Sequence, residues 1–173
     1  MKKTLTVGAV VENLSQVIEF IESNLEEVGC GMKTQTQIEV SVEELFVNIA
    51  HYAYSGAVGG ASDTVRNGTA NASCATGEKG ASYATSTAEA AKNSIGSATI
   101  TFDFASETRT VVISLIDSGV PYNPFVKPDP DITLSVEERQ IGGLGIFMVK
   151  KNMDEVLYSF AEGKNITTIK KII

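Results

Sequence analysis

Residues 42–50 read Val-Glu-Glu-Leu-Phe-Val-Asn-Ile-Ala, an apolar run that polar side chains interrupt. The run lies inside a helix predicted over residues 34–54, where apolar side chains recur every three or four positions. Glu44 and Asn48 are four residues apart, so they share one face of that helix. A polar pair in so apolar a stretch is costly to bury unless it has a function.

The residue types of this pair indicate one kind of chemistry. A carboxylate such as that of Glu44 can accept a proton from a nucleophile, and an amide oxygen such as that of Asn48 can bind Mg²⁺. The alternative is that both side chains lie on a solvated face beside Ser41. Glu43 belongs to a different face and is predicted to be a surface residue, whereas His51 is predicted to be structural or to lie at a rim.

The remaining elements extend outward from this helix in both directions along the chain. Strands are predicted over residues 4–10, 98–104, 110–116, 156–161 and 165–172. Two further helices are predicted over residues 14–28 and 146–153. The last four strands form two hairpins. The pattern predicts an α/β (α+β) two-layer sandwich, in which helices cover one face of a mixed β-sheet.

Residues 56–97 differ in composition from the rest of the chain. Of these 42 residues, 28 are Gly, Ala, Ser or Thr, which offer little apolar area to offset the entropy of ordering. We interpret the segment as a low-complexity insertion within a single domain of residues 1–173. We expect it to extend into solvent rather than to fold over a bound ligand.

Charge and cysteine content exclude several function classes. The net charge of −7 argues against a nucleic-acid or membrane partner, because both need clustered Lys and Arg. No apolar run approaches the roughly 20 residues that span a bilayer. Cys30 and Cys74 are far apart and have no metal-ligand spacing with His51, so we interpret them as free thiols in the reducing cytoplasm.

Residues 117–119, Asp-Ser-Gly, directly follow the predicted strand 110–116. An Asp at the end of a strand can accept a hydrogen bond from an exocyclic amine of a ligand. A glycine two residues later lets the backbone approach a flat ring closely. The alternative is an Asx-type turn, which the same three residues would also make.

Residues 142–145, Gly-Gly-Leu-Gly, open the predicted helix 146–153. Glycines at this place free backbone N–H groups, and the helix dipole favours an anion such as a phosphate. The stretch is neither a P-loop, because Gly-Lys-Ser/Thr is missing, nor a Rossmann fingerprint. The alternative is a flexible loop before a packed amphipathic helix.

The order of the three motifs resembles the ATP site of the GHKL superfamily. Glu-x-x-x-Asn on a helix precedes Asp-x-Gly after a strand, and Gly-Gly-x-Gly opening a helix follows. The whole chain except residues 56–97 resembles the bacterial anti-sigma-factor serine/threonine kinases, and the resemblance implies a Bergerat-type ATP-binding fold. The matching stretches are residues 42–50, 116–119, 143–151, 154–156 and 165–168.

This resemblance implies ATP and Mg²⁺ as cofactors and a role for each motif. Glu44 would be the general base for a serine hydroxyl of a protein substrate, and Asn48 would bind Mg²⁺. Asp117 would accept a hydrogen bond from the adenine amino group. Gly119 would lie beneath the ring, and Thr168 would support the hydrogen-bond network.

The phosphates and the protein partners follow from the same resemblance. Gly143, Leu144 and Gly145 would form the phosphate-side loop, and residues 120–141 would act as a lid. The family phosphorylates a small anti-anti-sigma protein, and its homodimer holds a sigma factor. The helix predicted at 14–28 departs from this pattern, because it has acidic side chains but no Lys or Arg.

Two other functions compete with the kinase. A non-catalytic ATP-binding regulatory module that captures a partner protein is the alternative, but the presence of both Glu44 and Asn48 favours an enzyme. A histidine-kinase catalytic domain is disfavoured, because the single histidine, His51, lies within the ATP-site helix.

Overall fold

The computed structural model describes residues 1–54, 96–126, 130 and 144–173. The predicted insertion at 56–97 lies outside the described residues except for Gly96 and Ser97, as does most of the predicted lid. The helices are η1 (Val11–Asn13), α1 (Leu14–Glu27), α2 (Met32–Asn48), η2 (Ile49–Ala53), η5 (Pro124–Val126) and α3 (Leu144–Asn152). The strands are β1 (Lys2–Gly8), β2 (Ser97–Ala105), β3 (Thr110–Asp117), β4 (Glu155–Ala161) and β5 (Lys164–Ile172).

The strands form one five-stranded sheet in the order β1-β2-β3-β5-β4. The two predicted hairpins, β2–β3 and β4–β5, are confirmed. Every pairing among the described strands is antiparallel, so the prediction of a mixed sheet is wrong. The reason is that β5 returns between β3 and β4, which keeps those two strands from pairing with each other.

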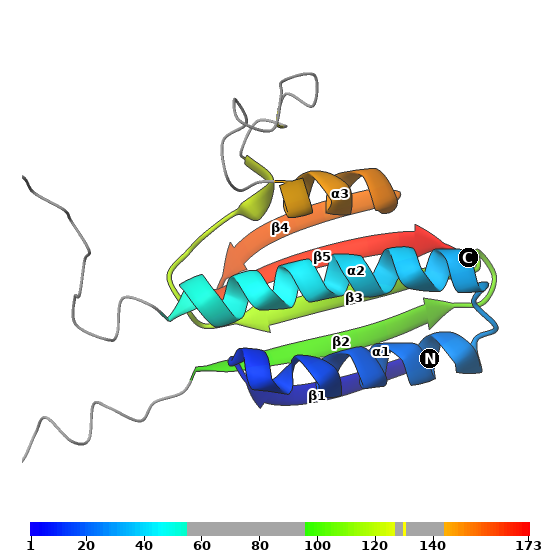
Figure 1. The fold of residues 1–173 in the computed structure, drawn as a ribbon, viewed down its shortest axis with the longest axis horizontal. Helices are drawn as coiled ribbons and strands as arrows, with labels where there is room; N and C mark the ends of the chain where they lie inside the picture. Colours follow the sequence, from blue (N-terminus) through cyan, green and yellow to red (C-terminus); the bar gives the residue numbers. More distant parts are fainter. Residues whose placement is uncertain (55–95, 127–129, 131–143) are drawn as a thin grey trace, which may run out of the picture.

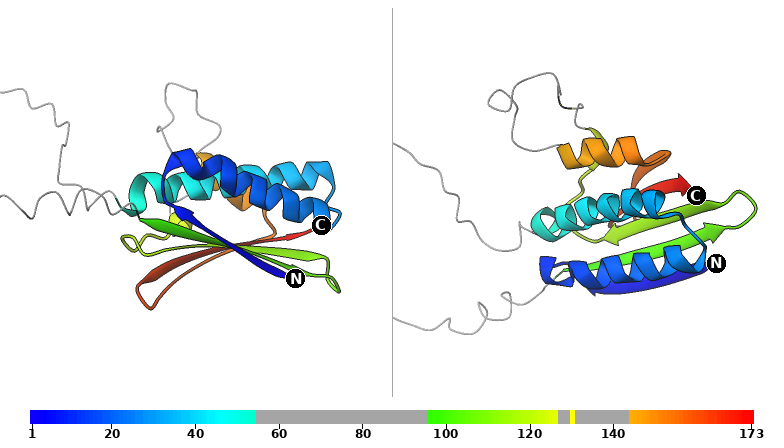
Figure 2. Two further views of the ribbon diagram at one scale, coloured as in Figure 1. Left: turned by 90° about the horizontal axis from the view of Figure 1, so that it is seen from below. Right: turned by 45° about the vertical axis from the view of Figure 1, so that its right-hand side comes forward.

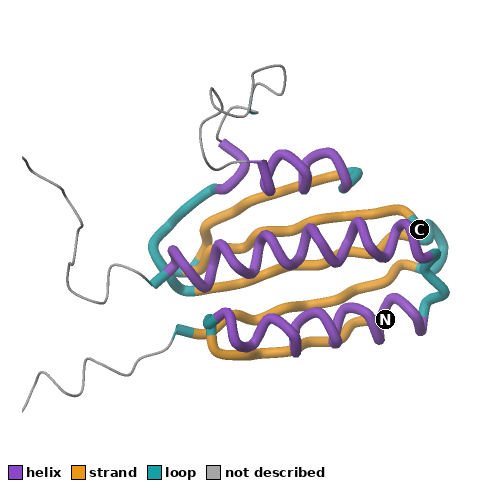
Figure 3. Tube along the Cα trace, in the orientation of Figure 1, coloured by secondary structure: helices purple, strands orange, loops and turns teal. Residues whose placement is uncertain are grey.

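The helices form a second layer on one face of this sheet (Figures 1 and 2). α1 lies over β1 and β2, α3 lies over the β4 edge, and α2 lies between α1 and α3. Figure 3 shows the same separation of helices from strands along the chain trace. The predicted two-layer sandwich is therefore confirmed. None of the helices that the structure describes is long and apolar enough to span a bilayer.

The core lies between the two layers, because each element turns one apolar face toward the other. In β3 the buried positions alternate along the strand, as the period of two requires. In α2 the buried positions recur every three or four residues, at Ile38, Val42, Leu45 and Phe46. The predicted apolar stripe of this helix is confirmed at these positions. Because the stripe faces the sheet, Glu44 and Asn48 lie on a different, half-buried side of α2.

The Tyr54 side chain links the described chain on either side of residues 55–95. Its hydroxyl donates to the carbonyl oxygen of Ser97 at 2.8 Å and accepts from the backbone N–H of Ser118 at 3.0 Å. Its ring covers Gly96, where an added Cβ would lie 2.2 Å from a ring carbon. The end of the α2–η2 helix and the start of β2 are therefore held together independently of the segment between them.

We predict that replacing residues 55–95 by a Gly-Ser linker of about six residues leaves the fold intact. A shorter loop costs less closure entropy, so the free energy of unfolding should stay the same or rise by up to about 2 kcal/mol. Urea denaturation followed by circular dichroism measures this. A deletion that also removes Gly96 and Ser97 is the matched control and should destabilise the protein. A large loss with the shorter deletion would contradict the prediction.

Candidate functional site

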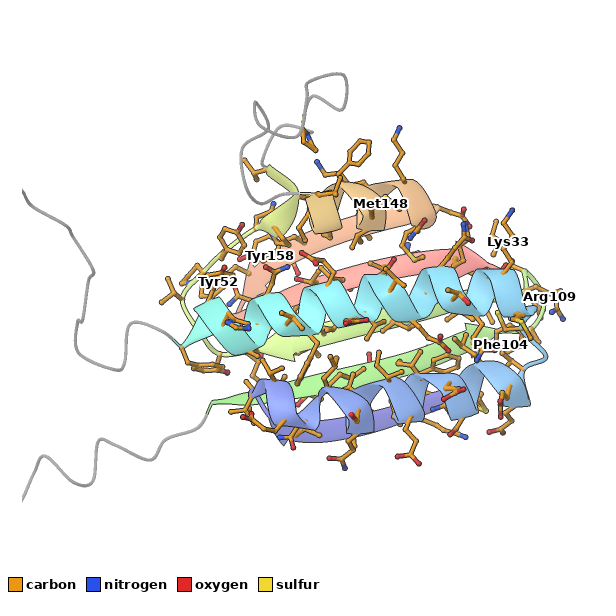
Figure 4. The ribbon with its side chains drawn as sticks, viewed as in Figure 1. Lys33, Tyr52, Phe104, Arg109, Met148 and Tyr158 are labelled. Carbon is orange, nitrogen blue, oxygen red and sulfur yellow. The ribbon has the colours of Figure 1, made fainter. Side chains whose placement is uncertain are left out.

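A cavity opens where the end of the α2–η2 helix meets the ends of β3 and β5. Figure 4 shows Tyr52 and Tyr158 at this end of the molecule, whereas Phe104 and Arg109 lie at the opposite end. The lining is largely apolar with a few polar groups, which is typical of ligand sites. The lining residues are Leu45, Asn48, Ile49, Tyr52, Ala53, Asp117, Val120, Tyr122, Pro124, Asn165 and Thr167.

Glu44 and Asn48 contact each other on the half-buried side of α2. The Asn48 amide nitrogen donates to the Glu44 carbonyl oxygen at 2.7 Å and to its carboxylate Oε1 at 2.9 Å. The amide nitrogen is therefore engaged, and the amide oxygen Oδ1 is left as an acceptor or cation ligand. Ser41 is fully buried and Glu43 is exposed, so the solvated face shared with Ser41 is wrong, and Glu43 is confirmed as a surface residue.

The Glu44 carboxylate also packs against the first turn of α3. A Cβ added to Gly145 would lie 2.0 Å from the carboxyl carbon of Glu44, so only a glycine fits there without displacing the acid. The positive end of the α3 dipole lies on this side and favours the negative charge. Leu144 is 54% exposed, and Gly143 lies outside the described residues.

Asp117 ends β3 at the cavity and is 5% exposed. Its Oδ1 accepts from the backbone N–H of Gly119 at 2.8 Å, which is the Asx-type turn that the sequence left as the alternative. The same oxygen accepts from the amide nitrogen of Asn165 at 2.9 Å. Within the described part of the chain, no hydrogen bond uses Oδ2. The turn and a ligand-binding role are therefore compatible, because each takes a different oxygen.

Gly119 lies against the end of the helix layer. An added Cβ would come within 2.2 Å of the Ala53 carbonyl oxygen. That oxygen accepts from the backbone N–H of Val120 at 2.9 Å, so a carbonyl that the helix end leaves without an intrahelical donor finds a partner here. Ala53 is the last of the five residues of the π-helical turn η2, a geometry that is frequent at functional sites.

The structure does not bring Thr168 to the cavity. Thr168 pairs with Ser114 across the β3–β5 ladder, and the two hydroxyl oxygens are 2.8 Å apart. Successive side chains of a strand point to opposite faces, so Thr168 lies on the open face of the sheet. Its neighbour Thr167 is buried and lines the cavity. The position predicted for Thr168 is therefore corrected to Thr167.

The sequence reasoning missed two cavity residues on β5, Asn165 and Thr167. Both lie on the inward face because they share the parity of Ile169, which is buried in the core. The alternation of the predicted strand 165–172 was the signal that could have identified them. His51 is exposed and its ring lies 6.0 Å from that of Tyr52, so it lies at the rim rather than among the cavity-lining residues.

We predict that Gly119→Ala lowers the free energy of unfolding by about 1–3 kcal/mol, the usual cost of forcing extra volume into a packed site. The new methyl group would meet the Ala53 carbonyl, and backbone must shift to admit it. Urea denaturation of the two proteins measures the difference. Gly31→Ala is the control, because nothing lies within 4 Å of its added Cβ, and it should cost less than about 1 kcal/mol. Equal stability of Gly119→Ala and the parent would contradict the contact.

The fold is shared with a solved structure. The chain is similar to the crystal structure of the RsbU and RsbW domains of Rv1364c from Mycobacterium tuberculosis, with a TM-score of 0.55 and 15% identity. The match covers 98% of this chain and 32% of the other, so this chain spans about a third of the solved chain. At this identity the likeness shows the fold alone. No curated protein matches this chain.

The sequence also matches one family, described as the histidine kinase-like ATPase domain, over residues 7–171. The matched range includes Glu44 and Asn48 on α2, Asp117 after β3, Gly145 in α3 and Thr167 on β5. The name of the family implies ATP as the ligand. Because the match extends over nearly the entire sequence, the chain belongs to the family of histidine kinase-like ATPase domains.

Proposed function

We propose that this chain is an ATP- and Mg²⁺-dependent protein serine/threonine kinase of the anti-sigma-factor type, acting on a small anti-anti-sigma protein. The observation that carries the proposal is the pair of bonds from the Asn48 amide to Glu44. They place an acid that can accept a proton beside the amide of Asn48, which lines the cavity and whose oxygen can bind a cation. A site that only binds nucleotide has no need of the acid.

The residues present fit a magnesium ion bound with ATP. Mg²⁺ prefers hard oxygen ligands and binds through one or two protein groups together with phosphate oxygens. Asn48 would supply such an oxygen, since its amide nitrogen is already used by Glu44. The bound ion would neutralise phosphate charge, and Asn48 would fix where that charge lies relative to the acid.

Glu44 would act on the protein substrate. As the base, its carboxylate would accept the proton of the serine hydroxyl while the hydroxyl oxygen attacks the terminal phosphorus; the bond from that phosphorus to the bridging oxygen would break, and ADP would leave. The Asn48 amide holds Oε1 at 2.9 Å, and Gly145 packs against the carboxyl group from α3. Phosphoryl transfer depends mainly on positioning and on charge neutralisation, and these contacts position the base.

The nucleotide would lie with its base at Asp117 and its phosphates toward the first turn of α3. Asp117 would accept from the adenine amino group through Oδ2, and Gly119 would let the backbone lie close to the ring. Gly143, Leu144 and Gly145 would face the phosphates with the N-terminal end of the helix dipole. Thr167 replaces Thr168 as the threonine at the adenine end.

The partners and the domain organisation are part of the same proposal. We propose a homodimer of single-domain chains whose residues 56–97 are an insertion, and the Tyr54 contacts with Gly96 and Ser97 support the insertion. The similar solved protein from Mycobacterium tuberculosis contains an RsbU domain beside its RsbW domain. A sigma factor is the second proposed partner, although α1 offers only acidic charges to hold it.

We predict that Glu44→Gln lowers the rate of phosphoryl transfer about 10²- to 10⁴-fold, the usual contribution of a general base. The amide keeps the size of the acid but cannot accept the proton, so ATP affinity should change less than about threefold. Transfer of radiolabelled phosphate from ATP to a small anti-anti-sigma protein measures the rate, and calorimetry measures binding.

Glu43→Gln is the matched control, because Glu43 is the exposed neighbour on the same helix, and it should leave the rate unchanged. A normal rate in Glu44→Gln would show that Glu44 is not the base. If the parent protein binds ATP and transfers no phosphate, the kinase proposal fails, and a nucleotide-binding module that captures a partner becomes the better description.

We predict that Asp117→Asn weakens ATP binding about tenfold or more, the usual effect of losing one hydrogen bond to a charged group. The substitution keeps the shape but removes the carboxylate that would accept from the adenine amine. Calorimetric titration with ATP and Mg²⁺ measures the dissociation constant. Asp103→Asn, on an exposed carboxylate of β2, is the control and should bind as the parent does. Unchanged affinity in Asp117→Asn would refute the adenine role.

A further inference from the structure

We propose that Asn165 is a positioning residue that fixes Asp117 as the adenine reader, an inference that rests on the proposed ATP site. Asn165 is 3% exposed and directly faces Asp117 across the β3–β5 ladder. Neither the sequence motifs nor the fold assigns it a function. Its side chain lies between Asp117 and residues 120–122, the start of the segment that follows Asp117.

The orientation of the Asn165 amide is fixed by its neighbours. Its Oδ1 lies 3.1 Å from the backbone N–H of Tyr122, which can only donate. Its Nδ2 lies 3.1 Å from the carbonyl oxygen of Val120, which can only accept. A flipped amide would oppose donor to donor and acceptor to acceptor. The nitrogen therefore faces Asp117, and the hydroxyl of Tyr158 donates to Oδ1 at 2.7 Å.

This orientation leaves each oxygen of Asp117 with a separate task. Oδ1 accepts from Asn165 Nδ2 at 2.9 Å and from the Gly119 N–H at 2.8 Å. Two donors converging on one oxygen hold the carboxylate plane in place, since it can rotate only by breaking both bonds. Oδ2 has no hydrogen bond among the described residues, and Asp117 lines the cavity. Because Asn165 holds Oδ1, the other oxygen, Oδ2, is left to accept a hydrogen bond from the exocyclic amino group of a purine.

Asn165 also ties the chain after Asp117 to the sheet. Through the Tyr122 N–H and the Val120 carbonyl it holds the first residues of that chain against β5. If Asn165 only supported the segment after Asp117, its loss would lower the affinity for every nucleotide alike. If Asn165 positions Asp117, its loss would lower the affinity only for nucleotides that carry the 6-amino group. The two roles are therefore separable by changing the ligand.

The experiment compares ATP with purine riboside triphosphate, which lacks the 6-amino group. Calorimetric titrations with Mg²⁺ are made on the parent protein, on Asn165→Ala and on Asn165→Leu. The leucine roughly keeps the shape of the asparagine, but it removes the Nδ2 donor without adding a charge. We expect the parent to bind ATP about tenfold or more tightly than the analogue. In both variants ATP affinity should fall about tenfold, while affinity for the analogue should change less than about threefold.

Asn24→Ala is the matched control, because Asn24 is an equally buried asparagine, 3% exposed, that lies on α1 and is not among the cavity-lining residues. It should leave both affinities unchanged. Circular dichroism establishes that each variant is folded. If both Asn165 variants unfold, Tyr158→Phe takes their place, because it removes only the hydroxyl that donates to Asn165. Its smaller loss of about two- to threefold should be confined to ATP.

Two results would overturn the inference, and they differ in what else they overturn. Equal losses for ATP and the analogue would mean that Asn165 supports the site without positioning Asp117, and the proposed function would stand. A parent protein that binds both nucleotides equally would remove the adenine role of Asp117, and that part of the proposed function would fail as well. A loss confined to ATP supports the inference.

Discussion

The cavity depends on one backbone contact between the two layers of the fold. The carbonyl oxygen of Ala53, at the end of the helix layer, accepts from the N–H of Val120, which follows the sheet layer. Gly119 makes this approach possible because it has no side chain to hold the layers apart. Together with the apolar core between the layers, this contact sets the position of the acid and amide of α2 relative to the carboxylate that ends β3.

On each side of this contact, an amide side chain holds a carboxylate in place. On the helix side the Asn48 amide holds Glu44, and on the sheet side the Asn165 amide holds Asp117. Each carboxylate has one oxygen engaged by an amide nitrogen. Bonds of this kind cost little in a half-buried site, because they satisfy groups that burial would otherwise leave without partners. The apolar core between the layers supplies the rigidity on which both pairs depend.

Much of the fold could be predicted from the sequence, because periodicity reports which face of each element is buried. The helices near Leu14–Glu27 and Met32–Asn48 and both hairpins were predicted within a few residues of their ends. The mixed sheet was wrong because strand direction depends on the order in which strands pair, and no local pattern records that β5 inserts between β3 and β4. The π-helical turn after Asn48 likewise has no sequence signature.

Contacts of the candidate site could be predicted where both residues lie on one helix. They could not be predicted where the residues lie on two different strands. The contact of Glu44 with Asn48 follows from helical spacing alone. The motif pointed to Thr168, whereas the alternation of β5 buries its neighbour Thr167 together with Ile169. The alternation of β5 could place Asn165 on the inward face, but not its bond to Asp117, because the two residues are 48 positions apart and only the ladder register brings them together.

Tyr54 has a consequence for how this chain can change. The Tyr54 hydroxyl bonds to both Ser97 and Ser118, and its ring covers Gly96. These contacts hold the helix layer against the start of β2 whatever the length of the sequence between them. Each doubling of such a loop costs only about 0.6 kcal/mol. A longer segment at this junction therefore adds little to the free-energy cost of folding, and an inserted reporter domain would leave the contacts of Tyr54 in place.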